Sequence, residues 1–459
     1  MAGLLRPGQE IELAISGLAA GGDGIGRHCG MAVFVAGTAP GDRVRAIITR
    51  THRQYAQARL LEVLIPAPSR VPPRCRLAGR CGGCQLQHIH YESQLEFKRQ
   101  LVVDALARIG KLGEVPVDSC RPAPELWGYR NKAQFPTTMV RDGRGRRLAA
   151  GIYEAGTHNL VEVGECAIQH PLNSQALAAT VDLARRHGIE AYDEDTGAGS
   201  LRHILVRSAA ATGEVMVVLV TRESQLPGVR SLARSLREQV PEVVTVAQNV
   251  NPRRTNVILG PHTRIVAGRG YLTDRLGPHR FRISPGSFFQ VNPGQAEVLC
   301  QLAADRAAAG PGDTVIEVYA GIGTITLCLA ERAGLVLGVE SHAPAVEDAR
   351  RNAAANRVTN VRFVRGEAEA VLPGLVRSGL TARAVVLDPP RRGCAPPALE
   401  AIAGLGSPRV VYVSCNPATL ARDLAFLAGR GYRTEEVIPL DMFPMTAHVE
   451  AVALLVRSA

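Results

Sequence analysis

The chain has 459 residues, 46% of them hydrophobic, which is enough for two to four domains with buried cores. Lysine and arginine outnumber aspartate and glutamate by 53 to 42, and the net charge of +11 favours a polyanion such as nucleic acid, although a basic enzyme without such a partner has the same balance. No run of about 18 apolar residues is present, and no secretory signal is recognisable, so we expect a cytoplasmic protein without membrane attachment.

Short β-rich runs separated by glycine turns fill the beginning of the chain. The runs cover 11–16, 32–35 and 43–49. Strands of this length and spacing indicate a small β-barrel, which we expect over 1–65. Arg43, Arg45, Arg50 and Arg53 make it basic. The proline-rich stretch 65–73 predicts a linker and a domain boundary.

Three cysteines follow the linker at the spacing C-x5-C-x2-C, namely Cys75, Cys81 and Cys84. In a reducing compartment, clustered thiols bind metal more often than they form disulfides. A fourth ligand must come from elsewhere, and both Cys120 and Cys166 are available. The spacing leaves zinc and an iron–sulfur cluster open. Zinc ribbons usually bring two C-x2-C knuckles, whereas four-cysteine clusters tolerate a distant fourth ligand.

The middle of the chain mixes helical and extended patterns. Apolar residues in 94–109 recur at helical spacing. The strand-like runs are 203–208, 214–221 and 242–249. Two basic runs, 129–132 and 141–147, fit RNA contact and solvated surface charge equally well. We predict a mixed α/β central domain over 66–285.

Strand-like and helix-like segments alternate from about Asp313 onward. The apolar strand-like runs are 314–318, 335–339, 361–364, 384–387 and 410–414. Helical segments rich in alanine, leucine and arginine separate them, which predicts a parallel α/β sheet. We therefore predict a Rossmann-like domain over 286–459, and a multidomain chain.

A glycine turn, Gly321-Ile-Gly323, follows the first of these strands and opens a helix. Such glycines let the backbone approach a ligand. A dinucleotide site would place a third glycine near Thr326, and a phosphate loop would need a Lys-Ser/Thr pair. A cofactor without a pyrophosphate fits better, and S-adenosylmethionine is the commonest. Glu340, which closes the next strand, can accept both ribose hydroxyls; an ordinary turn with a surface acid is the plainer alternative.

Later strand ends carry the residues that decide the reaction. Asp388-Pro-Pro-Arg forms a rigid loop, but similar loops occur in amino-group methyltransferases. Cys415, in Ser-Cys-Asn-Pro, points to a carbon acceptor. A thiolate added at C6 of uracil turns C5 into an enolate carbon that can attack a methyl sulfonium. A base must then remove the C5 proton, and Glu450 is the best candidate. The alternative for Cys415 is a buried structural cysteine.

These motifs occur in the same order in the RNA uracil-5-methyltransferases. The shared segments are Ser-Phe-Phe-Gln-Val-Asn (287–292), the Gly-Ile-Gly loop, Leu-Asp-Pro-Pro-Arg, Ser-Cys-Asn-Pro and the late Glu450. The chain resembles that family over nearly its whole length. It is most similar to the bacterial 23S ribosomal RNA branch, which carries an N-terminal TRAM barrel, an OB-like fold, and an iron–sulfur cluster. Two departures, Ala320 for a usual cysteine and Glu317 for a usual aspartate, affect only details of the cofactor pocket.

The resemblance implies a role for individual residues. The implied S-adenosylmethionine contacts are Gln290, Tyr319, Glu340 and Asp388. The implied ligands of a [4Fe–4S] cluster, with a structural or RNA-positioning role, are Cys75, Cys81, Cys84 and Cys166. Cys415 is implied as the nucleophile and Glu450 as the proton acceptor, while Phe288 is placed to stack on the target base.

The expected substrate is therefore RNA, most of all 23S ribosomal RNA, and no obligate protein partner is evident. A transfer RNA uracil-5-methyltransferase is the nearest alternative, because the motifs are shared. A base N-methyltransferase is less favoured and would not need Cys415. A radical S-adenosylmethionine enzyme, or an RNA-binding module built on its cluster, is the rival of another class. Radical enzymes typically use C-x3-C-x2-C with one iron left open, which differs from the spacing here.

Overall fold

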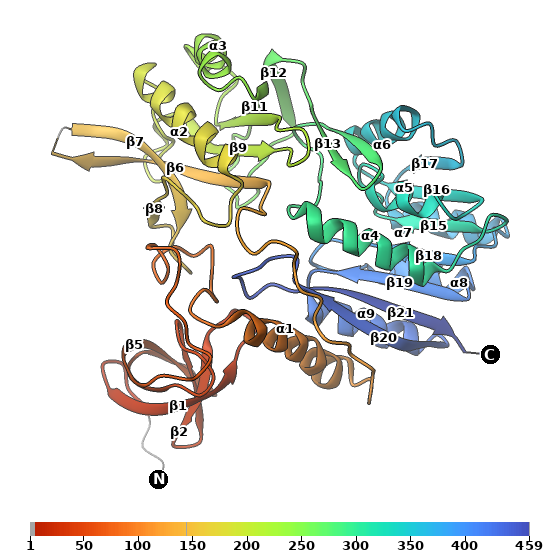
Figure 1. Cartoon of the computed structure of the whole chain (residues 1–459), viewed down its shortest axis with the longest axis horizontal. Helices are drawn as coiled ribbons and strands as arrows, with labels where there is room; N and C mark the ends of the chain where they lie inside the picture. Colours follow the sequence, from red (N-terminus) through yellow and green to blue (C-terminus); the bar gives the residue numbers. More distant parts are fainter. Residues whose placement is uncertain (1–4, 144, 459) are drawn as a thin grey trace.

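The computed structural model describes residues 5–143 and 145–458. Arg144, in the basic run 141–147, lies outside the described residues. Apart from a two-stranded hairpin, three sheets follow one another along the chain: a closed barrel, a seven-stranded mixed sheet and a second seven-stranded sheet (Figure 1). Among the described residues, no helix has the length and apolar character needed to cross a membrane.

The N-terminal barrel has five strands in the order β1-β2-β3-β5-β4. They are β1 (Glu10–Leu18), β2 (Gly24–His28), β3 (Met31–Val35), β4 (Arg43–Thr51) and β5 (Tyr55–Ile65). Alternate residues of β1, Ile11, Leu13 and Ile15, are buried inside the barrel, as the period of two requires. The predicted barrel is confirmed, with β2 and β5 as additional strands.

The proline-rich segment after the barrel is bound to it through one buried carboxylate. Asp42 accepts hydrogen bonds from the backbone N–H groups of Ala39 (2.7 Å) and Ala67 (2.8 Å) and forms an ion pair with Arg70. Buried carboxylates need such partners to offset their desolvation. This segment is therefore docked rather than free.

The middle sheet has the order β12-β11-β10-β9-β6-β7-β8. Its strands are β6 (Lys132–Asp142), β7 (Gly145–Tyr153), β8 (Leu160–Glu162), β9 (Leu201–Ser208), β10 (Val215–Thr221), β11 (Val243–Val250) and β12 (His262–Gly268). Helices α2 (Pro171–Arg186) and α3 (Val229–Gln239) pack against it in one apolar core. The runs predicted at 203–208, 214–221 and 242–249 correspond to β9, β10 and β11.

The helix predicted over 94–109 is α1 (Tyr91–Ala105), which continues into one π-helical turn, η1 (Leu106–Gly110). Although α1 precedes the middle sheet in the chain, Val102, Ala105 and Leu106 belong to the apolar core of the C-terminal sheet. The helix lies beside this sheet in Figure 1. The domain limits at 65 and 285 remain a prediction.

The C-terminal sheet has the order β17-β16-β15-β18-β19-β21-β20. Its strands are β15 (Thr314–Val318), β16 (Leu335–Glu340), β17 (Val361–Arg365), β18 (Ala384–Leu387), β19 (Arg409–Ser414), β20 (Tyr432–Leu440) and β21 (Glu450–Arg457). The first five strands are parallel, and β21 is antiparallel to both of its neighbours. The predicted Rossmann-like domain is thereby confirmed, with an antiparallel extension that the sequence did not indicate.

Helices cover both faces of this sheet. They are α4 (Pro293–Ala307), α5 (Thr324–Ala330), α6 (Ala343–Ala355), α7 (Ala368–Arg377), α8 (Pro396–Gly404) and α9 (Pro417–Ala428). Helices α4, α5 and α6 share one apolar core, while α7, α8 and α9 share the other with α1. A short hairpin, β13 (Leu272–Leu276) and β14 (His279–Ile283), joins the middle sheet to this domain. The strand order reverses between β15 and β18, and α/β sheets bind ligands at such a switch point.

Candidate active site

The turn after β15 lies at this switch point and has an unusual backbone. Tyr319, Gly321 and Gly323 adopt left-handed conformations, with φ of 67°, 55° and 85°. Glycine adopts such angles freely. A tyrosine there is strained, and strained residues of this kind gather at functional sites. The predicted cofactor residue Tyr319 thus lies in the strained part of the strand-to-helix turn.

Glu340 ends β16 and faces this turn. Its Oε2 accepts the N–H of Gly321 at 2.9 Å, and its Oε1 accepts the N–H of His342 at 2.7 Å. Each carboxylate oxygen has a second lone pair. Glu340 therefore stabilises the glycine turn and can still accept hydrogen bonds from the hydroxyl groups of a ligand.

Asp388 and Gln290 come together across the switch point. The Nε2 of Gln290 donates to Oδ2 of Asp388 at 3.4 Å. Burial raises the pKa of Asp388 to about 7. Both residues line one pocket with Tyr319 and Phe288, so four of the predicted site residues share it.

Glu317 and Ala320, the two departures from the family pattern, also line this pocket. Glu317 is buried and accepts a hydrogen bond from the hydroxyl of Thr326. Burial raises the pKa of this carboxyl well above its ordinary value. Glu317 therefore ties β15 to α5, beneath the turn.

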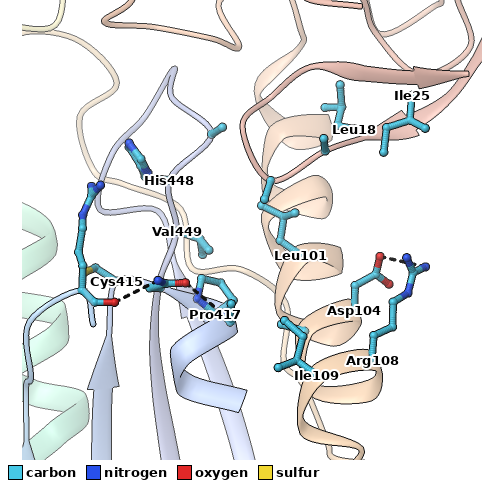
Figure 2. Close-up of a pocket in the computed structure, with 17 residues that line it drawn as sticks. Leu18, Ile25, Leu101, Asp104, Arg108, Ile109, Cys415, Pro417, His448 and Val449 are labelled. Carbon is cyan, nitrogen blue, oxygen red and sulfur yellow. Dashed lines mark hydrogen bonds and ion pairs between the residues drawn. The ribbon is translucent and has the colours of Figure 1, made fainter. Parts of the chain in front are cut away.

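Cys415 lines a cavity of about 450 Å³ (Figure 2). The cavity lies between the loop that carries Cys415, the barrel, and the helical segment formed by α1 and η1. It occupies the turn from β19 to α9. The next residue, Asn416, caps α9 by accepting the N–H of Ala418 at 3.1 Å. The Nδ2 of Asn416 donates to the backbone carbonyl of Arg391 at 3.0 Å. The Asp388-Pro-Pro-Arg391 loop and the cysteine loop are thus fastened together.

The charges around Cys415 oppose one another. Burial raises the pKa of the Cys415 thiol to about 11, and the carboxylates of Glu450 and Asp388 act in the same direction. Arg391 acts against them and favours the thiolate. Without RNA, the thiol is therefore mainly protonated at neutral pH.

Glu450 is brought to Cys415 by the antiparallel pairing of the last strand. Ser414 pairs with Ala451, so the residue that follows β19 lies beside the residue that begins β21. Glu450 is only 2% exposed. Burial and the nearby Asp388 raise the pKa of its carboxyl well above the ordinary value, while Arg391 lowers it. A carboxylate with a raised pKa is suited to accept a proton near neutrality.

The walls of the Cys415 cavity come from distant segments. Leu18 and Ile25 of the barrel, Leu101 of α1 and Ile109 of η1 line it opposite the cysteine (Figure 2). His448 also lines the cavity, and burial lowers the pKa of its imidazole to about 4, so the ring is neutral. The loop that carries Cys415 therefore faces the barrel.

The predicted cluster ligands lie near one another at the end of β7. Burial raises the pKa values of the Cys81 and Cys84 thiols, and the negative charges of Cys166 and Cys75 raise them further, which places the four cysteines near one another. Backbone N–H groups point to sulfur, from Gly83 to Cys81 (3.4 Å) and from Leu77 to Cys75 (3.4 Å). Among the described residues, however, no three His, Cys, Asp or Glu side chains form a group that could hold a metal ion.

Cys120, the other possible fourth ligand, lies in a different environment. It is buried, and the charges that act on it are those of Asp441 and Lys98 rather than of the four other cysteines. The structure therefore groups Cys166, and not Cys120, with the C-x5-C-x2-C segment.

Comparison with known proteins identifies the family. Residues 232–458 match the model for tRNA (uracil-5-)-methyltransferases, and residues 5–61 match the TRAM domain. The chain is 43% identical to an uncharacterised RNA methyltransferase of Halalkalibacterium halodurans, over 97% of this chain and 96% of the relative. A Listeria monocytogenes relative, also named an uncharacterised RNA methyltransferase, is 43% identical over 99% of both chains. The chain belongs to the RNA uracil-5-methyltransferase family.

A solved structure agrees with this assignment. The tRNA (uracil-54, C5)-methyltransferase of Pyrococcus abyssi, in complex with S-adenosyl-L-homocysteine, is 30% identical and superimposes with a TM-score of 0.75. The match covers 97% of this chain and all of that chain. The protein is therefore an S-adenosylmethionine-dependent RNA uracil-5-methyltransferase, and its N-terminal barrel is a TRAM domain.

Two features of this methyltransferase's site were not predicted from sequence. Arg391 is the last residue of the Leu-Asp-Pro-Pro-Arg motif. The motif alone did not show that its positive charge acts on Cys415 and Glu450. The barrel wall of the cavity, with Leu18 and Ile25, had no sequence signal at all. Ordinary apolar residues at a strand end do not indicate which distant loop they face.

Proposed function

We propose that this methyltransferase acts through a covalent bond between Cys415 and C6 of a uridine. The observation that carries the proposal is the meeting of Cys415, Glu450 and Asp388 at one sheet edge, where their charges influence one another. An N-methyltransferase would need no thiol here, because a nitrogen acceptor already has a lone pair. A thiol beside a buried carboxyl matches the two needs of a C5 acceptor, namely activation and proton removal.

The steps follow from these two side chains. The Cys415 thiolate adds to C6, and the electron pair of the C5–C6 bond moves toward the C4 carbonyl, which makes C5 nucleophilic. S-adenosylmethionine, when bound, would supply an electrophilic methyl group. C5 would form a bond to this methyl group as the methyl–sulfur bond breaks, which would leave S-adenosylhomocysteine. The carboxylate of Glu450 then takes the proton from C5. The electrons of the broken C–H bond restore the double bond, and Cys415 leaves as a thiolate.

The residues around the switch point fit this cofactor. Glu340 has free lone pairs at the end of β16, where a ribose binds in related sheets. Gln290, Tyr319 and Asp388 line the pocket next to it. We assign these four residues to cofactor binding and Phe288 to stacking on the target uracil, since its ring is 58% exposed at the same pocket.

The division of labour between Cys415 and Glu450 gives the decisive experiment. Glu450→Gln should still form the bond to C6 and methylate C5, but release should stall because no base removes the proton. The trapped complex should survive denaturing electrophoresis, and labelled methyl should travel with the protein band. RNA extracted from cells lacking the gene is the substrate.

The control is the Cys415→Ala variant, alone and combined with Glu450→Gln. Both should bind S-adenosylhomocysteine in calorimetry, transfer no methyl group and form no trapped band. Substantial turnover by Cys415→Ala would overturn the covalent route. A folded Glu450→Gln enzyme that turns over normally would reject its assignment as the base.

For the substrate, we propose 23S ribosomal RNA, on the similarity of the motifs to that branch of the family. Transfer RNA is the second candidate, because the related Pyrococcus abyssi enzyme is named as acting on it. Mass spectrometry of both RNA classes from cells lacking the gene distinguishes the two. Loss of 5-methyluridine from 23S ribosomal RNA alone is expected, and loss from transfer RNA alone would overturn the assignment.

We also propose that Cys75, Cys81, Cys84 and Cys166 hold a [4Fe–4S] cluster. The support is their mutual proximity and the backbone N–H groups directed at two of the sulfurs. Hydrogen bonds to sulfur are a usual feature of such ligands and tune the cluster. The cluster would supply local structure and no step of methyl transfer.

Protein purified without oxygen should contain about four irons per chain, as four-cysteine ligation implies. Cys166→Ser should lose this iron, whereas Cys120→Ser should keep it and serves as the matched control. Stoichiometric zinc without iron would refute the proposed cluster. Loss of iron from Cys120→Ser alone would refute the ligand set.

A further inference from the structure

The loop 287–292 presents one exposed aromatic ring between buried neighbours. Phe288 is 58% exposed, whereas Ser287 and Phe289 are each 1% exposed. A phenyl ring held in solvent gives up the favourable free energy of burial. Some other interaction must therefore hold the backbone of this loop in place.

Ser287 is held from two sides. Its hydroxyl donates to Oδ2 of Asp348 on α6 at 2.7 Å. Its carbonyl accepts a hydrogen bond from Nη2 of Arg207 on β9 at 3.0 Å. Arg207 and Asp348 are 1% and 2% exposed. Fixing both the side chain and the carbonyl of Ser287 fixes the direction in which the next residue, Phe288, projects.

The other side of the ring is held as well. Asn131 is buried, and its Nδ2 donates to the carbonyl of Gln290 at 3.1 Å. Its backbone N–H donates to the carbonyl of Val291 at 2.9 Å. Phe289 packs on Phe281 with 5.8 Å between ring centroids. Strand β9 and the residue that precedes β6 thus hold the loop on both sides of Phe288.

Arg207 is not placed where it would best serve stability. Its Nη1 has no hydrogen-bond partner and, within the described chain, its guanidinium has no ion pair with a carboxylate. Burial lowers the pKa of Arg207 to about 10, and the charges of Asp274 and Asp348 offset this only in part. Its neighbour across the sheet is Lys132, and burial together with the charges of Arg207 and Arg130 lowers the pKa of this lysine to about 7. Burying a cation in this way is unfavourable, so its use lies in the loop that it holds.

We infer that Arg207 is a positioning residue, which directs Phe288 toward the target uracil. The inference rests on the proposed stacking role of Phe288. Arg207 does not touch the reacting atoms in this arrangement and acts through the carbonyl of Ser287. Without that hydrogen bond, the backbone before Phe288 is no longer fixed, and the Phe288 side chain is free to point in other directions.

The test is a double-mutant cycle on single-turnover methyl transfer, with labelled S-adenosylmethionine and RNA extracted from cells lacking the gene. Arg207→Met should slow transfer by about 100-fold, the size of effect that a misplacement near 1 Å produces. Binding of S-adenosylhomocysteine in calorimetry should stay at the parental value. In a Phe288→Ala background, Arg207→Met should cause little further loss, because residues that act as a unit are not additive.

Arg202→Met is the matched control. Arg202 lies on the same strand, is 6% exposed and also donates to backbone carbonyls, those of Asn251 (2.9 Å) and Arg253 (2.5 Å). Its loss should affect melting temperature but leave methyl transfer close to parental. An equal loss of transfer in the control would show that the effect reflects general damage to the sheet and would overturn the inference.

Ser287→Ala gives a second route that leaves the buried charge untouched, and it applies even if Arg207→Met does not fold. It removes the bond to Asp348 and should give a smaller loss that vanishes in the Phe288→Ala background. Losses that add to that of Phe288→Ala would overturn the inference. So would a parental rate for Arg207→Met beside an impaired Phe288→Ala, with the proposed function intact. A parental rate for Phe288→Ala would instead refute the stacking role itself.

Discussion

At the scale of single residues, the site combines a weakly acidic thiol, Cys415, with a positive charge, Arg391, that favours ionisation of the thiol. The pKa of the Cys415 thiol is raised to about 11 by burial and by two carboxylates, above its ordinary value of 9.0. Of the three charged side chains that act on this thiol, Glu450, Arg391 and Asp388, Arg391 is the positive one. The thiol is thus kept protonated, and unreactive toward chance electrophiles, while no RNA is bound.

Arg391→Gln should therefore make Cys415 less reactive in the RNA-free enzyme. The thiolate is the reactive form. Because the pKa lies near 11, alkylation by iodoacetamide should rise about tenfold per pH unit from pH 7 to 10. Removing the positive charge should raise the pKa further and move this profile to higher pH. Mass spectrometry of the peptide that contains Cys415 follows the reaction.

The neighbouring arginine provides the control for this experiment. Arg392 is exposed, and its charge acts on Tyr319 rather than on Cys415. Arg392→Gln should leave the alkylation profile of Cys415 where it is. An unchanged profile in Arg391→Gln would mean that this residue acts only through the backbone carbonyl that Asn416 binds.

At the scale of elements, one buried ion pair joins α1 to the segment that leads into β21. Lys98 pairs with Asp441, both side chains are fully buried, and the Lys98 Nζ also donates to the carbonyl of Phe443 at 3.0 Å. The segment 441–449 leads directly into Glu450, the proposed base and the first residue of β21. The pair therefore fixes the loop that positions this carboxyl relative to α1, which lines the opposite wall of the cavity.

Lys98→Met should destabilise the protein by about 3–5 kcal/mol, because it leaves a buried carboxylate without its partner. The double change Lys98→Met with Asp441→Leu should recover most of the loss, since no unpaired charge remains. Urea unfolding followed by the fluorescence of Trp127, the single tryptophan, measures this, as Trp127 packs in a cluster with Met445 of the same segment.

An exposed ion pair gives the comparison. Arg351 and Glu347 on α6 are each 51% exposed, and Arg351→Met should cost at most about 1 kcal/mol. If Lys98→Met costs no more than this, the buried pair does not contribute as proposed. If the double variant is as unstable as the single one, the loss comes from packing rather than charge.

Elements of the C-terminal sheet could be predicted wherever the local pattern was unambiguous. The runs 314–318 and 384–387 coincide with β15 and β18, because short apolar runs between turn signals are typical of buried parallel strands. The edge strand β20 was missed, since it carries arginine, threonine and two glutamates in its first half. The order β19-β21-β20 could not be predicted either, because periodicity shows which face is apolar and not which strand it pairs with.

The site shows the same limit. Motifs identified the residues at strand ends, because the carboxyl edge of a parallel sheet collects them. They did not identify the docking of α1 on the C-terminal core, the Lys98–Asp441 pair or the Arg207–Ser287 bond. Each of these joins residues that are 80 or more positions apart, or elements of different sheets, and a single sequence contains no signal for such pairs.

At the scale of the whole molecule, three distant regions of the chain surround Cys415, the proposed nucleophile. The barrel, α1 and the β19–α9 turn share the cavity of about 450 Å³. The chain carries a net charge of +11 and acts on a polyanion. We therefore expect the TRAM barrel to contact the RNA next to the target uridine, in addition to any binding farther away.

Leu18→Glu tests this arrangement, because Leu18 is a barrel residue in the wall of the Cys415 cavity. A carboxylate there should repel the RNA backbone and weaken RNA binding about tenfold, or about 1.4 kcal/mol. Binding of S-adenosylhomocysteine should be unaffected, since the pocket that we assign to it lies at the switch point. Raising the salt concentration should shrink the difference in RNA affinity from the parent enzyme, because salt screens the repulsion.

Leu61→Glu is the control, as Leu61 is 39% exposed on β5 of the same barrel but lies outside the cavity. Filter-binding titrations of all three proteins at several salt concentrations give the comparison. Equal weakening by Leu61→Glu would assign the effect to the overall charge of the barrel, and a salt-independent loss in Leu18→Glu would assign it to altered barrel packing.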